Sequence, residues 1–130
     1  MESQLVTKRV LGIVEDERDM QLLLRLTLGA DPRLDLGGEA TSAEEALELA
    51  QSWEPDLIVL DQSLDGELTG LEAAPLLKAL VPETKILLFT AYDLRARAEA
   101  EPAVDDFLRK DNFAALLPTV NRMLGLEPLT

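Results

Sequence analysis

Carboxylates stand at the ends of two apolar segments of this chain, where a buried charge is costly unless a partner compensates it. The segment DLIVLD runs four apolar residues directly into Asp61, and the segment RVLGIVED ends on Glu15 and Asp16. Carboxylates that crowd together must take up a proton or share a cation. The sequence contains no cysteine and no histidine, so oxygen ligands favour a hard ion such as Mg²⁺, Mn²⁺ or Ca²⁺ over zinc.

A hydroxyl and an ammonium end two further apolar segments. KILLFT ends on Thr90, and VDDFLRK ends on Lys110. Beside a divalent ion, both groups would donate to the oxygens of a phosphoryl group and neutralise the charge that develops as phosphate transfers to a carboxylate. Asp61 is the natural nucleophile, because it ends the most buried of these segments.

Each of these residues taken alone has an ordinary structural explanation. Glu15 or Asp16 suits the N-terminus of a following helix, and Thr90 suits a turn. Lys110 suits a solvated surface, and Phe107 suits a core. The hypothesis of a site depends on their convergence, because no structural requirement brings all these residue types to one place.

Short apolar segments alternate with amphipathic ones along the chain, which is typical of a parallel sheet with helices on both faces. The pattern predicts strands and helices in turn, at residues 9–14, 20–29, 34–40, 41–53, 56–60, 71–80, 85–90, 93–101, 104–109 and 113–124. The expected fold class is therefore α/β, a (βα)5 doubly wound sheet of five parallel strands. Ligands of such sheets bind beyond the carboxyl ends of the strands, where the polar residues above would meet.

Local signals refine three of the expected helices. Ser42 followed by Glu45 predicts a capping box at the start of the second helix. Pro75 would cost a helix interior about 3 kcal/mol, so the third helix either starts near Ala74 or is kinked. Pro118 is expected inside the last helix.

Length and composition indicate one globular domain. A chain of 130 residues can bury a single core, and 47% hydrophobic with 28% charged residues excludes a disordered protein. The sequence has no run of eighteen apolar residues and no signal-peptide pattern, so we expect a cytoplasmic protein without membrane contact. A net charge of −13 repels nucleic acid, so we expect cations or proteins as partners.

Four segments in register resemble the signature segments of response-regulator receiver domains, the CheY-like domains of two-component signalling. They are IVEDE, LIVLD, LLFTA and FLRK, at residues 13–17, 57–61, 87–91 and 107–110. The resemblance covers about residues 8–124 and implies the flavodoxin-like receiver fold. We therefore expect a single receiver domain over residues 1–130, standing alone without an output domain.

The resemblance assigns a metal site and a phosphoacceptor. Asp61 would accept the phosphoryl group and, with Asp16, would bind Mg²⁺ (or Mn²⁺) directly. Glu15 would hold a metal-bound water, and Ser63 would lend its backbone carbonyl to the ion.

The resemblance also implies a switch and partners. Thr90 would bond a phosphoryl oxygen and shift on activation, Lys110 would pair with the phosphoryl group, and the ring of Phe107 would move between outward and inward positions. The donor would be a histidine kinase or a phosphotransfer protein, and the target a separate protein. Relatives often form homodimers through their fourth and fifth helices, so the resemblance implies that this chain could form a homodimer.

The sequence departs from the receiver pattern in three places. Asp65 stands where receivers usually carry proline, and Gly70 arrives one residue late. The interval from Thr90 to Lys110 is about two residues short, so the fourth helix is expected to be short. Asp111 follows Lys110 where relatives have a cis-proline bond; a trans bond is the default, and Asp111 could then compete for the ammonium.

Two alternative functions stay open. A pseudo-receiver of the same fold would act as an adaptor without phosphorylation. A phosphatase or phosphotransferase would act on an external substrate through an aspartyl phosphate, but such enzymes usually carry a second aspartate where this chain has Ser63. We therefore expect a signalling module and not an enzyme.

Overall fold

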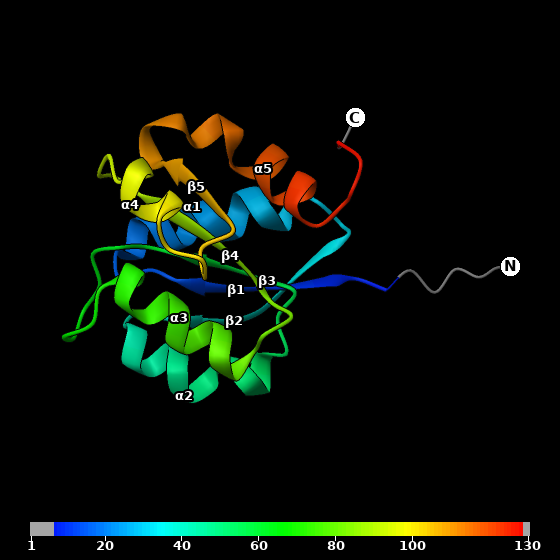
Figure 1. Ribbon diagram of the computed structural model, residues 1–130. Helices are drawn as coiled ribbons and strands as arrows, with labels where there is room; N and C mark the ends of the chain where they lie inside the picture. The colour runs from blue at the N-terminus through cyan, green and yellow to red at the C-terminus, as the bar shows by residue number, and fades with distance from the viewer. Residues whose placement is uncertain (1–6, 129–130) are drawn as a thin grey trace, which may run out of the picture.

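Five parallel strands form one sheet in the computed structural model, which describes residues 7–128 (Figure 1). The strands are β1 (Arg9–Val14), β2 (Leu34–Ala40), β3 (Leu57–Leu60), β4 (Lys85–Thr90) and β5 (Asp106–Arg109). Their order is β2-β1-β3-β4-β5, which is that of flavodoxin-like sheets. The predicted (βα)5 fold is confirmed.

Helices connect the strands and cover both faces of the sheet. They are α1 (Arg18–Gly29), α2 (Ala43–Trp53), α3 (Gly70–Leu80), α4 (Arg95–Glu99) and α5 (Leu116–Met123), with a 3-10 helix η1 (Lys110–Ala115) before α5. Figure 1 shows α2 and α3 on one face and α1 and α5 on the other. Across residues 7–128, no helix combines the length and the apolar character needed to cross a membrane.

The central strand β3 contributes to two apolar cores. Ile58 and Leu60 pack into the core beneath α2 and α3, whereas Leu57 and Val59 pack into the core beneath α1 and α5. All four side chains are at most 2% exposed. Burial on both faces explains the uninterrupted apolar run, and it leaves the end of the strand as the place for a charged side chain.

The two helical prolines occupy different positions in their helices. The third helix, α3, begins at Gly70, so of the two alternatives the start near Ala74 is wrong and Pro75 lies inside the helix. The last helix, α5, begins only at Leu116, after the 3-10 turn. Pro118 therefore occupies the first turn, where a missing N–H breaks no intrahelical bond, and not the interior.

Helix capping explains the early start of α3. The Thr69 hydroxyl accepts from the backbone N–H of Glu72, whose carboxylate accepts from the backbone N–H of Thr69, which completes a capping box. At α2 only half of the predicted box forms. The Ser42 hydroxyl accepts from Glu45, but the Glu45 carboxylate accepts from the backbone N–H of Thr41 at 2.8 Å.

Glycines on β1 and β2 make room for the indole of Trp53. A Cβ at Gly12 would lie 2.7 Å from Cε3 of the ring, and a Cβ at Gly38 would clash with the pyrrole side of the same indole. Glycine lowers strand propensity, yet here it permits a large aromatic side chain to close one end of the core. Gly29, by contrast, has open space where a Cβ would stand.

We predict that alanine at two of these glycines affects the free energy of unfolding differently. Gly38→Ala should lower the free energy of unfolding by about 1–3 kcal/mol, because the indole must move. Gly29→Ala, the control at the end of α1, should leave it unchanged or raise it by up to about 1 kcal/mol. Urea unfolding followed by Trp53 fluorescence measures both, and a Gly38→Ala protein as stable as the parent would contradict the packing described.

Candidate functional site

The polar residues selected from the sequence meet beyond the carboxyl ends of four strands. Glu15 and Asp16 follow β1, Asp61 follows β3, Thr90 ends β4 and Lys110 follows β5. A cleft of about 270 Å³ opens there, lined by Asp16, Glu17, Asp61, Ser63, Thr90, Ala91, Tyr92 and Lys110. Ser63 is exposed at this cleft, so the expected set gathers at one place apart from Phe107.

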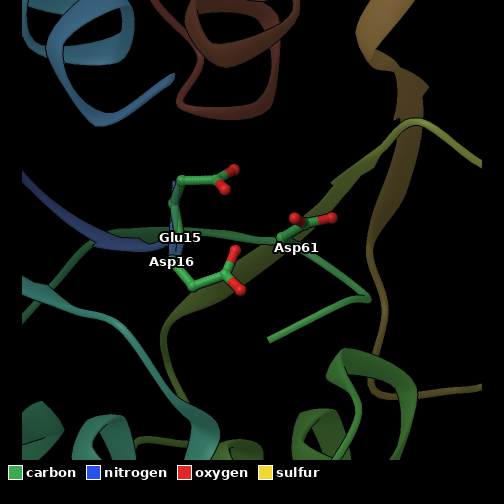
Figure 2. A group of neighbouring side chains, drawn as sticks. All are labelled: Glu15, Asp16 and Asp61. Carbon is green, nitrogen blue, oxygen red and sulfur yellow. The ribbon is translucent and has the colours of Figure 1, made fainter. Parts of the chain in front are cut away.

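Three carboxylates form the acidic part of the site. One oxygen each from Glu15, Asp16 and Asp61 lies within 4.8 Å of the others, and Figure 2 shows the side chains of Glu15 and Asp16 reaching toward that of Asp61. Glu15 is 1% exposed and Asp61 is 5% exposed. This oxygen-only donor set fits a hard divalent ion that keeps several of its waters.

Lys110 compensates the buried carboxylates. Its Nζ lies 2.8 Å from Oε1 of Glu15 and 2.9 Å from Oδ2 of Asp61, with Oε1 of Glu17 farther away at 3.9 Å. Burial raises the pKa of Glu15, although the hydrogen bond from Lys110 lowers it in part. The pKa of Lys110 is raised, because its bonds to Glu15 and Asp61 outweigh the burial that opposes its charge.

Asp111 does not compete for this ammonium. All peptide bonds within residues 7–128 are trans, including the one that joins Lys110 to Asp111, as expected. The Asp111 carboxylate pairs with Arg109 at 3.2 Å, and the ion pairs of Lys110 across the described chain are with Glu15, Glu17 and Asp61. The expected competition is wrong, because the neighbouring arginine holds Asp111.

The Thr90 hydroxyl is fully buried and has no hydrogen-bond partner among residues 7–128. An unsatisfied buried hydroxyl costs about 1–3 kcal/mol, so its presence calls for an explanation. Thr90 lines the cleft together with Asp61 and Lys110. A ligand oxygen in the cleft would supply the missing partner, and a phosphoryl group carries three of them.

Phe107 lies outside the cleft. Its ring is 5% exposed and packs in the core beneath α3 and α4, with the guanidinium of Arg95 located 5.1 Å from the ring centroid. The ring therefore faces inward, and its movement as a switch stays a prediction. The fourth helix is five residues long, as the short interval between Thr90 and Lys110 predicted.

Two residues that hold the loop after Asp61 were not predicted. The backbone N–H of Gln62 donates to Oδ1 of Asp61 at 2.7 Å, and its side-chain Oε1 accepts from the N–H of Leu71 at 2.8 Å. A Cβ at Gly70 would clash with the carbonyl of Asp61, so only glycine allows the chain to return this closely. In the sequence, Gly70 stands out only as a displaced pattern glycine and not for its close approach to Asp61, whereas Gln62 offers no signal.

Comparison with known proteins identifies a family. The sequence profile of the response regulator receiver domain matches residues 11–121. The response regulator protein VraR of Staphylococcus saprophyticus is 28% identical over 104 residues, which are 78% of this chain and 49% of that protein. The DNA-binding transcriptional activator DevR/DosR of Mycobacterium tuberculosis is 38% identical over 81 residues, which are 62% of this chain and 36% of that protein. The chain thus spans half or less of the length of these relatives.

Solved structures show the same fold. A LuxR-family two-component response regulator from Aurantimonas sp. superposes with a TM-score of 0.83 at 25% identity, over 95% of this chain and 90% of that one. The response regulator domain of Thermotoga maritima CheB superposes with a TM-score of 0.78 at 21% identity, over 94% of this chain and 99% of that one. The second likeness concerns the fold alone.

Removing the Lys110 charge should destabilise the protein in a pH-dependent way. Lys110→Met leaves Glu15 and Asp61 buried without compensation, which should cost about 3 kcal/mol of unfolding free energy at pH 7 without divalent ions. Burial raises the pKa of Glu15 in the folded protein. As the pH falls, Glu15 therefore takes up a proton in the folded protein at a higher pH than in the unfolded chain. The deficit should therefore shrink as the pH falls through that raised pKa.

Denaturant titrations at pH 7 and pH 5 measure this deficit. Lys85→Met, which removes an exposed lysine at the opposite end of β4, serves as the control and should have little effect at either pH. An equal loss for both variants would show that Lys110 does not compensate the carboxylates.

Proposed function

Because this chain belongs to the response regulator receiver family of two-component signalling, we propose that Asp61 accepts a phosphoryl group from a histidine kinase or a phosphotransfer protein. The observation that carries the proposal is one cleft that combines a nearly buried Asp61, its partner Lys110 and the unpartnered hydroxyl of Thr90. These are a nucleophile and two donors for the group that it would receive.

The reaction would depend on Mg²⁺ (or Mn²⁺). Asp16 and Asp61 would bind the ion directly, Glu15 through a water molecule and Ser63 through its backbone carbonyl. When bound, the ion neutralises charge on the phosphoryl oxygens. The cluster of oxygen donors from Glu15, Asp16 and Asp61 supports this assignment.

The residues of the chain would carry out the transfer. An oxygen of Asp61 forms the new bond to phosphorus, while the bond from phosphorus to the donor's histidine nitrogen breaks and the electron pair leaves with that nitrogen. Lys110 and Thr90 donate to the oxygens of the moving group. The backbone N–H of Gln62, bonded to Oδ1 of Asp61, holds the carboxylate in one orientation.

The output would be a changed protein surface. The added charge would give the Thr90 hydroxyl a new hydrogen-bond partner. It would thereby shift the equilibrium between the inward and outward positions of the Phe107 ring. We infer protein partners and no direct nucleic-acid contact by this domain, because the net charge of −13 repels phosphates. We infer no turnover of an external substrate, since Ser63 stands where such enzymes usually carry an aspartate.

Phosphorylation is tested with Mg²⁺ and a small acyl-phosphate donor. Intact mass should show one added phosphoryl group on the parent and none on Asp61→Asn, whereas Asp35→Asn, an exposed aspartate on β2, should behave as the parent. Thr90→Val should slow uptake by about 100-fold. No uptake from acyl phosphates or from kinases would favour the pseudo-receiver, and steady phosphate release from an ester would favour the phosphatase.

Metal binding gives an independent prediction. Mg²⁺ at 100 times its dissociation constant should add about 2.7 kcal/mol to the free energy of unfolding and raise the melting temperature. Asp16→Ala should remove that gain, and Asp19→Ala, an exposed acid in the first turn of α1, should keep it. If Mg²⁺ leaves the melting temperature of the parent unchanged, the proposed metal site is wrong.

A further inference from the structure

We propose that Glu44, in the first turn of α2, is a positioning residue for the Mg²⁺ site. It would act through residues 62–69, here called the β3–α3 loop, which include Ser63 at the cleft. The inference rests on the proposed function, because it concerns how the loop is held for metal binding. Glu44 itself does not line the cleft.

The Glu44 carboxylate binds the backbone of this loop. Its Oε2 accepts from the N–H of Glu67 at 3.0 Å and from the N–H of Leu68 at 3.1 Å. A parallel bridge between Ser42 and Asp65 ties the same two segments together. The N-cap and the first turn of α2 therefore hold the loop at Asp65, Glu67 and Leu68.

The loop backbone is shaped to receive this carboxylate. Gly66 has a φ of 86°, in the left-handed region that favours glycine. A Cβ at Gly66 would also lie 2.5 Å from Oε1 of Glu44. The glycine thus serves both the turn and the close approach of Glu44.

Electrostatics show why the contact matters. The pKa of Glu44 is lowered, because its own backbone N–H and those of Glu67 and Leu68 bond to the carboxylate. These amide bonds outweigh the desolvation that opposes the charge. The carboxylate therefore interacts with the loop backbone as an anion.

Among residues 7–128, Glu44 supplies the side-chain hydrogen bonds to the middle of the loop, which the Ser42–Asp65 bridge and the packing of Leu64 and Leu68 on the core also hold. The start of the loop is held by Gln62, whose carbonyl accepts from Gly70 at 3.0 Å, and its end is held by the Thr69–Glu72 capping box. Residues 56–74 contain no proline. Glu44 therefore adds a polar restraint between these anchors, and its loss would let the segment that carries Ser63 vary more in position.

The experiment compares Glu44→Ala and Glu44→Gln with Glu48→Ala by calorimetric Mg²⁺ titration. Glu48 is exposed one turn further along α2 and has no side-chain hydrogen bond within residues 7–128. We expect the Mg²⁺ dissociation constant to rise about 10-fold in Glu44→Ala, less in Glu44→Gln and not at all in Glu48→Ala. Melting temperatures without Mg²⁺ should stay near that of the parent, because Glu44 is exposed.

Two further measurements separate positioning from general damage. Amide hydrogen exchange at Glu67 and Leu68 should accelerate in Glu44→Ala, and saturating Mg²⁺ should restore its rate of phosphoryl uptake. A parent that binds no Mg²⁺ overturns the proposed function and this inference together. Two results overturn this inference alone, provided that the parent binds Mg²⁺. Either Glu44→Ala binds Mg²⁺ as tightly as the parent, or Glu48→Ala loses as much Mg²⁺ affinity as Glu44→Ala.

Discussion

The compensation of two buried carboxylates by one ammonium is the interaction on which the site depends. Glu15 and Asp61 are at most 5% exposed and stand close enough to share Lys110. Isolated, either charge would be expensive at this depth, and together they would repel. The lysine makes the pair tolerable, and it also keeps a cluster of negative oxygen atoms available for a divalent ion. Folding stability and the proposed chemistry therefore depend on the same contact.

Strand register places these groups side by side. Val14 pairs with Leu60 and Leu60 pairs with Leu88. The residues that follow β1 and β3 therefore lie side by side beyond the carboxyl ends of the strands. Thr90 pairs with Arg109, which sets Lys110 next to the end of β4. A slip of one residue would turn every side chain of a strand to the opposite face. The two apolar cores prevent such a slip, and in doing so they fix the geometry of the cleft.

The fold and the convergence of the site could be predicted because both follow from short-range patterns. Runs such as LIVL mark strands buried on both faces, and the topological rule for parallel sheets then brings Asp61 and Lys110 together. Side-chain contacts to loop backbone were not predictable in this way. Glu44 bonds to N–H groups of Glu67 and Leu68, far along the chain, and no period in the sequence marks such a pair. The start of α3 stayed open between two alternatives for a related reason: the cost of Pro75 was weighed, but the capping box that favours a start at Gly70 was not recognised.

The residues that depart from the receiver pattern, Asp65, Gly70 and Asp111, lie outside the strands, and the structure indicates why they leave the site assembled. The trans bond before Asp111 does not displace Lys110, because β5 positions the lysine and Arg109 holds the following aspartate. Asp65 stands in place of a proline, and the loop around it is anchored to α2 instead. Strand ends thus set which groups meet, whereas loops set how firmly the surrounding backbone is held. Changes in these loops should therefore alter the affinity and lifetime of what binds in the cleft before they alter which residues bind it.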